Sequence, residues 1–139
     1  MHVFEAIEAV SWTPLGKWIS RGVDGHYVVV RLKEERLQLD AKTLEAMKAA
    51  GKSMKGKPYD LLFKWSDDKI YCSELVWKIY KRGAGIELSP LKSFKDYKLD
   101  SPLVRSIIQK RYGDSINLNE RVVAPSDILE STLLEQISF

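Results

Sequence analysis

The pattern of hydrophobic and polar residues predicts extended segments at the start of the chain. Odd and even positions of residues 3–8 fall on opposite faces of an extended chain, which predicts a strand, and residues 10–13 form a second extended piece. Pro14 stands where helices commonly begin, and Gly22 stands where a short helix would end. The chain therefore opens with two extended segments followed by a short helix.

β-Branched and aromatic residues dominate residues 26–32, which makes this segment the strongest strand prediction in the sequence. Asp40 suits the N-cap of a helix that runs to about Lys55. Gly56 follows this helix, and Pro58 prevents its continuation.

From Tyr71 the pattern becomes helical again, with an apolar stripe that Gly83 and Gly85 bring to an end. The remaining sequence predicts shorter elements. These are a helix from Pro102 to Gly113, a strand at 121–123, a helix at 125–129 and an extended segment at 133–139. Together the elements predict one α+β domain over residues 1–139.

Composition and charge narrow the function classes. The 139 residues are 45% hydrophobic and 29% charged with a net charge of +3, which is ordinary for one globular domain. The richest basic stretch, residues 48–57, holds four lysines without interleaved aromatic residues, so a nucleic-acid partner is not expected. No apolar run approaches the roughly 20 residues of a transmembrane helix. Oligomeric state and compartment stay open.

Motifs for metals and cofactors are missing from the sequence. One cysteine and two distant histidines do not make a zinc motif, and neither a glycine-rich phosphate loop nor a GxSxG motif occurs. We therefore expect no cofactor and no metal. The segment from Met1 to Ala6 has no basic region typical of a signal peptide.

Cys72 is the main candidate for chemistry, because it falls in the first turn of the helix predicted from Tyr71. Unpaired backbone N–H groups and the helix dipole favour negative charge there, and the thiolate is the reactive form of cysteine. The backbone N–H of such a residue can also stabilise an oxyanion. The alternative is a small buried hydrophobic residue, the commonest role of a lone cysteine.

Glu5 is the second candidate, because its carboxylate shares a strand face with Val3 and Ile7. A carboxylate on an apolar face needs a partner or a function. Alternatively that face is the outer one, and the other side of the strand points inward. His2 stands at the terminus and His26 opens a strand, and both are more typical of surface residues than of a catalytic base.

Several motifs resemble the YiiX-like (YebB-like) proteins, a circularly permuted branch of the NlpC-type papain-like superfamily. Three main motifs occur in the same order and cover nearly the whole chain. They are Val-Phe-Glu-Ala at 3–6 with Thr-Pro-Leu at 13–15 and Trp-Ile at 18–19, Gly-Lys-Pro-Tyr-Asp at 56–60, and Trp-Ser-Asp-Asp at 65–68 running into Tyr-Cys-Ser-Glu-Leu-Val-Trp at 71–77. Weaker likenesses stand at 111–113 and 122–125.

The resemblance implies a permuted papain-like domain that attacks an amide or ester carbonyl through a thiolate. Cys72 matches the nucleophile, and Glu5 matches the acidic position that orients a histidine. Tyr71 and Tyr59 match aromatic positions that line the substrate pocket. Cell-wall peptides, other isopeptides and lipid acyl groups are the substrates that this chemistry allows.

The family histidine lies in a strand before the Phe-Glu-Ala stretch, at which this chain begins, so neither His2 nor His26 matches its position. We therefore expect a domain that lacks its N-terminal strand, with an open sheet edge and weak or no activity. A non-catalytic binding module that keeps the fold and cleft is the alternative. A lysine-based binder of membranes or nucleic acid is a weaker third.

Overall fold

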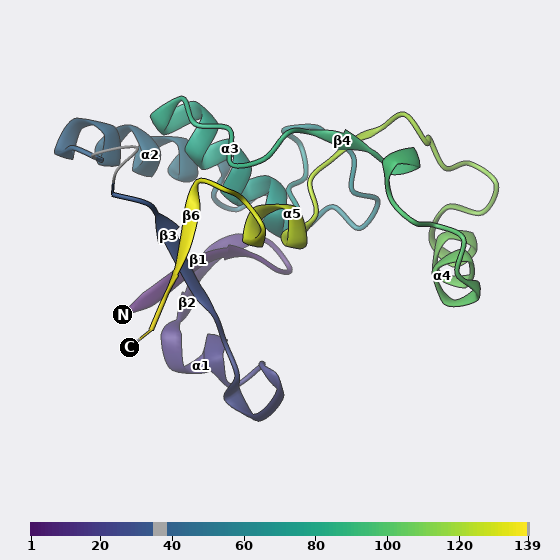
Figure 1. The fold of residues 1–139 in the computed structure, drawn as a ribbon, viewed down its shortest axis with the longest axis horizontal. Coiled ribbons are helices and arrows are strands. Elements are labelled where there is room, and N and C mark those ends of the chain that lie inside the picture. Colours follow the sequence, from purple (N-terminus) through teal and green to yellow (C-terminus); the bar gives the residue numbers. More distant parts are fainter. Residues whose placement is uncertain (35–38, 139) are drawn as a thin grey trace.

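The computed structural model describes residues 1–34 and 39–138 and shows an α+β fold, as predicted (Figure 1). Helices and strands are interspersed along the chain. They are β1 (His2–Ala6), β2 (Val10–Pro14), α1 (Leu15–Ile19), η1 (Val23–Gly25), β3 (Val29–Leu32), α2 (Ala41–Met54), α3 (Cys72–Ala84), β4 (Lys92–Ser93), η2 (Phe94–Asp96), α4 (Pro102–Tyr112), β5 (Arg121–Val122), α5 (Pro125–Leu129) and β6 (Leu134–Ile137), where η marks a 3₁₀ helix.

Helices α2 and α3 pack against each other and form the layer that positions the rest of the fold. The N-cap prediction for α2 is confirmed, because the side chain of Asp40 accepts a 2.7 Å hydrogen bond from the Thr43 N–H. A Cβ on Gly83 would lie 2.4 Å from the Cα of Met47, so only glycine permits this close approach. Gly85 ends α3 in the left-handed conformation (φ 70°).

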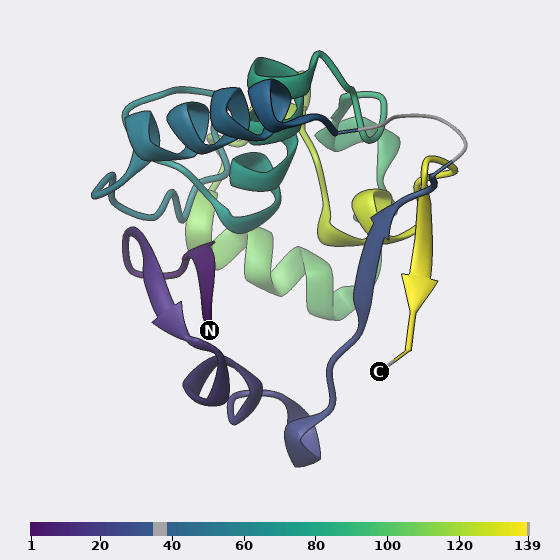
Figure 2. The same ribbon diagram turned by 90° about the vertical axis from the view of Figure 1, so that its left-hand side faces the viewer.

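The strands form three antiparallel pairs: β1 with β2, β3 with β6, and β4 with β5. Figure 2 separates the first two pairs and shows that β1 and β3 flank the space between them. The side chains of Phe4 and Ala6 pack into one core cluster with Leu75, while Leu32 belongs to a second cluster with Trp77. Both strand pairs therefore rest on α3.

The structure departs from the predicted elements in two places. The predicted strand at 26–32 begins only at Val29, because the residues before Val29 have no ladder partner among the described residues. The structure also contains β4 and η2, which were not predicted. The extended segment predicted at 133–139 is β6 over Leu134–Ile137, and its last residue lies outside the described part of the chain.

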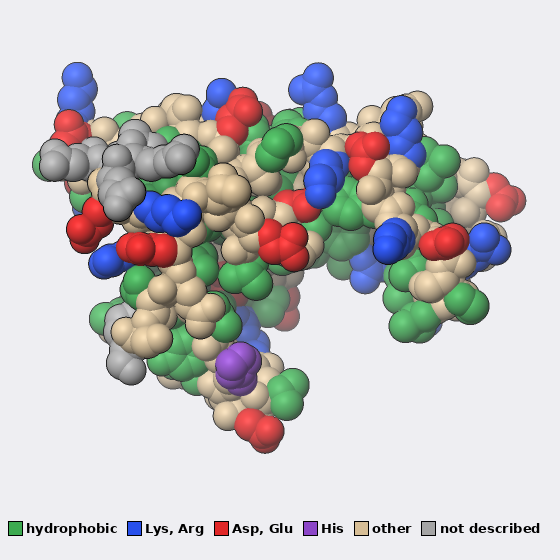
Figure 3. Space-filling model, viewed as in Figure 1, with side chains coloured by type: hydrophobic (Ala, Val, Ile, Leu, Met, Phe, Trp, Pro, Cys, Tyr) green, Lys and Arg blue, Asp and Glu red, His purple; other side chains and the backbone are tan. Residues whose placement is uncertain are grey.

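Helix α4 stands apart from the other helices in Figure 1, and the space-filling view shows a hollow between it and the end of the molecule that carries α1 (Figure 3). Basic and acidic side chains are interspersed over this face. Among the helices described, none has the length and hydrophobicity needed to cross a bilayer.

A buried ion pair fixes the start of α3. The ammonium of Lys78 lies 2.6 Å from a carboxylate oxygen of Glu74, and these side chains are 3% and 0% exposed. The other oxygen of Glu74 accepts a 3.1 Å hydrogen bond from the Tyr71 N–H, just before the helix. Lys78 also lies 3.0 Å from Asp67 and 4.7 Å from the centre of the Trp65 ring. The pair therefore ties the loop before α3 to its first two turns.

We expect Lys78→Met to lower the free energy of unfolding by about 3–5 kcal/mol, because it leaves the Glu74 carboxylate buried without a partner. Urea denaturation measures the change. The matched control is Lys48→Met, which breaks the exposed Lys48–Glu45 pair and should cost under about 1 kcal/mol. Adding Glu74→Gln to Lys78→Met should recover part of the loss. If Lys78→Met and Lys48→Met lowered the free energy of unfolding equally, the buried pair would not have the stabilising role described.

Asp67 should make folding stability depend on pH in the acid range. Its pKa is lowered to about 2, chiefly by the hydrogen bond from Arg82 and also by Lys78. A carboxylate with a lowered pKa stabilises the folded state above its unfolded value near 4, and this stabilisation is lost as the pH falls toward 2.

The stability difference between wild type and Asp67→Asn should therefore be full at pH 5 and shrink as the pH approaches 2. Urea denaturation at intervals across this range measures it. Ser66→Ala, at a neighbouring position without a titratable group, is the control and should show no such change. If the stability difference between wild type and Asp67→Asn stayed constant down to pH 2, Asp67 would not cause the pH dependence.

Candidate active site

Cys72 is the first residue of α3, and its side chain is exposed. The prediction that it lies at a helix N-terminus is confirmed, and the buried-cysteine alternative is wrong. The first backbone hydrogen bond of the helix runs from the Leu75 N–H to the Tyr71 carbonyl, so the N–H groups before Leu75 have no partner within the helix. The thiol thus lies beside free donors at the positive end of the helix dipole.

The residues on either side of Cys72 are buried and hold a distant segment of the chain. The hydroxyl of Tyr71 accepts a 3.2 Å hydrogen bond from the Val123 N–H. The hydroxyl of Ser73 donates a 2.7 Å bond to the Val123 carbonyl. Burial raises the pKa of Tyr71 well above its usual value, so its hydroxyl stays neutral. Both backbone groups of Val123 are therefore attached to the start of α3.

These contacts form a cavity of about 270 Å³ that opens beside the thiol. Most of its lining residues are aromatic or aliphatic. They are Tyr59, Phe63, Tyr71, Cys72, Ser73, Phe94, Val122, Val123, Ala124 and Pro125. Cys72, Tyr59 and Tyr71, all predicted from the sequence, meet at this cavity. Its apolar lining suits an apolar group next to the thiol.

Tyr59 provides a polar group close to the sulfur. Its hydroxyl donates a hydrogen bond to Sγ of Cys72, with an O–S distance of 3.7 Å. Burial, and then the hydrogen bond with Cys72, raise the pKa of Tyr59 to about 12. Tyr59 therefore remains protonated at neutral pH and can donate a hydrogen bond to the sulfur or to an oxygen near it.

Asp60 shapes the wall of the cavity, a role that the sequence interpretation did not assign. Its buried carboxylate accepts hydrogen bonds from the backbone N–H groups of Leu62 (2.9 Å) and Lys64 (3.1 Å). The turn places Phe63 at a φ of 51°, with its ring edge-on to Tyr71. An aspartate followed by a tight turn is a recognisable signal, because its side chain readily caps nearby N–H groups.

Glu5 lies on β1 and does not line this cavity. Both of its carboxylate oxygens accept hydrogen bonds from one Arg21 nitrogen, at 2.7 and 2.6 Å. The Glu5 carboxylate was expected to need a partner, and Arg21 is that partner. The side chains of Phe4 and Ala6 pack into the core. The structure brings Cys72, Tyr59 and Tyr71 together and leaves Glu5 in a separate ion pair.

The two histidines are exposed and lie outside the cavity. His2 begins β1, and His26 follows η1. No histidine among the described residues therefore lines the cavity that holds Cys72.

Comparisons with known proteins identify the family and the relatives of this chain. A family model described as permuted papain-like amidase enzyme, YaeF/YiiX, C92 family, matches residues 1–138. The uncharacterized protein YiiX of Escherichia coli (strain K12) is 38% identical over 137 residues, which make up 99% of this chain and 66% of that protein. A crystal structure described as that of the metalloprotein YiiX from Escherichia coli O157:H7 is 39% identical, with a TM-score of 0.91, covering 99% of this chain and 74% of that one.

The described residues of this chain do not fit a metal ion. Within residues 1–34 and 39–138, no group of three or more His, Cys, Asp or Glu side chains is placed to hold one, and protein metal sites commonly need three such ligands.

The family match, the sequence identity and the fold agree over nearly the whole chain. The chain therefore belongs to the permuted papain-like amidase family, YaeF/YiiX, C92.

Proposed function

We propose that this domain is a cysteine hydrolase that cleaves amide or ester bonds, with Cys72 as the nucleophile. The observation that carries the proposal is the exposed thiol at the N-terminus of α3, which opens on an apolar cavity beside the Tyr59 hydroxyl. Acyl transfer needs a nucleophile, donors to the oxyanion and a substrate pocket, and the thiol, the N–H groups at the helix start and the cavity support the proposal of these three roles. Membership of an amidase family supports the same chemistry.

The reaction begins when the Cys72 thiolate attacks the carbonyl carbon and the C=O electron pair moves onto oxygen. The Cys72 N–H and the Tyr59 hydroxyl are the proposed donors to this oxyanion. As the tetrahedral intermediate collapses, the C=O bond re-forms, the bond to the amine or alcohol breaks, and the leaving group takes a proton from solvent water. Water then hydrolyses the thioester, which releases the acid and restores the thiol.

The acyl side of the substrate is the part we assign to the cavity of about 270 Å³. Its aromatic and aliphatic walls favour an apolar group next to the scissile carbonyl, with Tyr59 and Tyr71 as substrate-binding residues. Cell-wall peptides, other isopeptides and lipid acyl groups all present an amide or ester carbonyl. Glu5 remains the proposed partner of a histidine base, and Arg21 would hold its carboxylate in place.

A second function has an observation of its own. No histidine among the described residues lines the cavity, so the thiol lacks a neighbouring general base there. A general base contributes about 10²–10⁴-fold to such reactions. A binding module that retains the cleft and holds an apolar ligand without cleaving it is therefore the competing proposal.

Added imidazole should separate the two proposals, because it can replace a missing base in solution. We expect the wild-type protein to hydrolyse p-nitrophenyl butyrate slowly, with a rate that rises with imidazole concentration above the imidazole-only background. Cys72→Ser should show no such rise. Iodoacetamide should also alkylate Cys72 in the folded protein, because the thiol is exposed. Identical hydrolysis rates for wild type and Cys72→Ser would favour the binding module.

Tyr59→Phe tests the proposed oxyanion donor. Loss of one such donor costs about 10²–10³-fold in related acyl transfers, so we expect a large drop in imidazole-assisted hydrolysis. Alkylation by iodoacetamide develops no oxyanion and should change much less. Tyr27→Phe, at an exposed tyrosine outside the cavity, is the matched control and should leave both rates unchanged. If Tyr59→Phe lowered the rates of hydrolysis and alkylation equally, Tyr59 would act on the thiol and not on the oxyanion.

A further inference from the structure

Helix α4 presents an apolar side that the rest of the described chain leaves uncovered. None of its residues, all of which the structure describes, is buried, and Leu103 and Ile107 are 71% and 44% exposed. These two side chains lie one turn apart on the same side of the helix. Helix α4 makes no extensive contact with another described helix or strand, and Figure 1 shows it at one end of the molecule.

Local signals in the sequence, more than packing, keep α4 helical. The hydroxyl of Ser101 accepts a 3.2 Å hydrogen bond from the Val104 N–H at the start of the helix. Pro102 takes the first helical position, and Gly113 follows the last turn. A helix of 11 residues with so little tertiary packing is only marginally stable in water. Its apolar side would therefore be stabilised by a partner outside the chain.

A turn with two exposed leucines is attached to the C-terminal end of α4. The side chains of Leu61 and Leu62 are 64% and 37% exposed. The Tyr112 hydroxyl donates a 2.6 Å hydrogen bond to the Leu62 carbonyl. The Arg111 guanidinium lies 5.3 Å from the centre of the Phe63 ring. The helix and the turn therefore form one continuous part of the surface.

The exposed side of α4 is positively charged as well as apolar. Leu103, Ile107, Lys110 and Arg111 follow the i, i+4, i+7, i+8 spacing of one helix face, and the helix contains no acidic residue. Among residues 1–34 and 39–138, neither Lys110 nor Arg111 forms an ion pair. Figure 3 shows hydrophobic side chains at this end of the molecule, with Lys and Arg side chains beside them.

Lys64 adds a further cation in the attached turn, where its side chain is exposed. Glu120 lines a small pocket together with Lys64. The Glu120 carboxylate accepts a 2.8 Å hydrogen bond from the Trp65 N–H, and among the described residues it forms no ion pair with this lysine. The turn therefore repeats the combination found on α4, apolar side chains next to a cation.

We propose that residues 61–64 and 102–112, called here the α4 surface, dock on a lipid bilayer that contains anionic phospholipids. The exposed leucines and Ile107 would enter the boundary between headgroups and acyl chains, and the cations would lie among the phosphates. A helix with one apolar side, basic residues and no acidic residue is typical of helices that lie in the plane of the membrane interface. Phe63 also lines the cavity at Cys72, so docking would bring that cavity close to the bilayer.

Charge and the distribution of apolar residues favour a bilayer over other partners. In a two-fold dimer through the α4 surface, both copies would present the same positive charge to each other. A helix that binds in a protein groove carries apolar anchors that continue to position i+7, whereas here that position is Lys110. Leucine and isoleucine offer no flat ring on which a nucleic-acid base could stack.

Cosedimentation of the 139-residue protein with vesicles tests the proposal. We expect binding to vesicles of equal parts phosphatidylglycerol and phosphatidylcholine, and much weaker binding to vesicles of phosphatidylcholine alone. Added sodium chloride should weaken the first interaction. Hydrogen exchange at the amides of residues 102–112 should slow when the anionic vesicles are present. Binding is the readout, so the test does not depend on whether Cys72 is catalytic.

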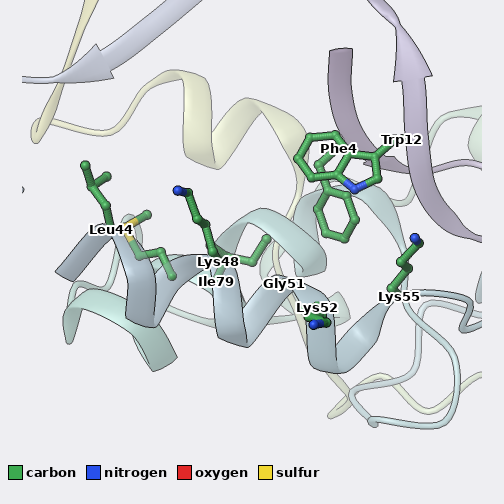
Figure 4. Close-up of a pocket in the computed structure, with 9 residues that line it drawn as sticks. Phe4, Trp12, Leu44, Lys48, Gly51, Lys52, Lys55 and Ile79 are labelled. Atoms are coloured by element: carbon green, nitrogen blue, oxygen red, sulfur yellow. The ribbon is translucent and has the colours of Figure 1, made fainter. Parts of the chain in front are cut away.

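Reversal of two charges on the α4 surface should weaken vesicle binding strongly. For Lys64→Glu combined with Lys110→Glu we expect a loss of about 30-fold or more. The matched control is Lys52→Glu combined with Lys55→Glu, which lowers the net charge by the same amount. These two lysines line the apolar groove of about 490 Å³ on α2 (Figure 4). The control should weaken binding much less, because a flat bilayer does not reach into a groove.

A second pair of variants tests the apolar part of the α4 surface at constant charge. Leu103→Ser combined with Ile107→Ser should weaken binding to anionic vesicles about tenfold. Both positions are exposed, so the free energy of unfolding should change little, which urea denaturation checks. Leu44→Ser, at a groove position that is 42% exposed, is the control and should leave binding unchanged.

Three results would overturn the proposal. The first is no binding to anionic vesicles, or equal binding to both kinds of vesicle. The second is an equal loss of binding in the two lysine variants, or no loss in the serine variant of α4, since charge without a docking face would then explain the binding. The third is a dimer in sedimentation without vesicles in which the α4 amides are protected, since a second copy would then cover this surface.

Discussion

The ion pair between Lys78 and Glu74 determines where α3 begins, and the position of the thiol follows from it. Glu74 uses one carboxylate oxygen for Lys78 and the other for the Tyr71 N–H, so the residue before Cys72 is held in an extended conformation. Burial raises the pKa of Glu74, and the Lys78 ammonium opposes that effect. A helix that began one residue later would leave Cys72 outside its first turn, at the N-cap.

The same helix start organises the residues around the thiol. Tyr71 and Ser73 point into the protein and bind Val123, while Cys72 between them stays exposed. Because Tyr71 is extended and the helix begins at Cys72, the residues on either side of Cys72 are buried while Cys72 itself stays on the surface. The apolar cavity is the space enclosed when the segment around Val123 is drawn to this helix start.

Much of this arrangement could be predicted from local sequence. The cap at Asp40, the glycine after α3 and the position of Cys72 at a helix start all follow from short-range rules. The bond from Val123 to Tyr71 spans 52 residues, and the ion pair of Glu5 with Arg21 depends on how α1 folds back, so neither has a local signal. The predicted strand at 26–32 is shorter in the structure because strand length is set by the partner, here β6.

The attachment of Val123 has a consequence for how the cavity changes size. Both of its backbone groups are bound by side chains that flank Cys72, whereas the sulfur of Cys72 takes no part in the attachment. Loosening residues 122–125 would widen the cavity while the thiol and its helix stayed in place. Residues 122–125 therefore set the width of the cavity, and substitutions in that segment would change this width without changing the thiol.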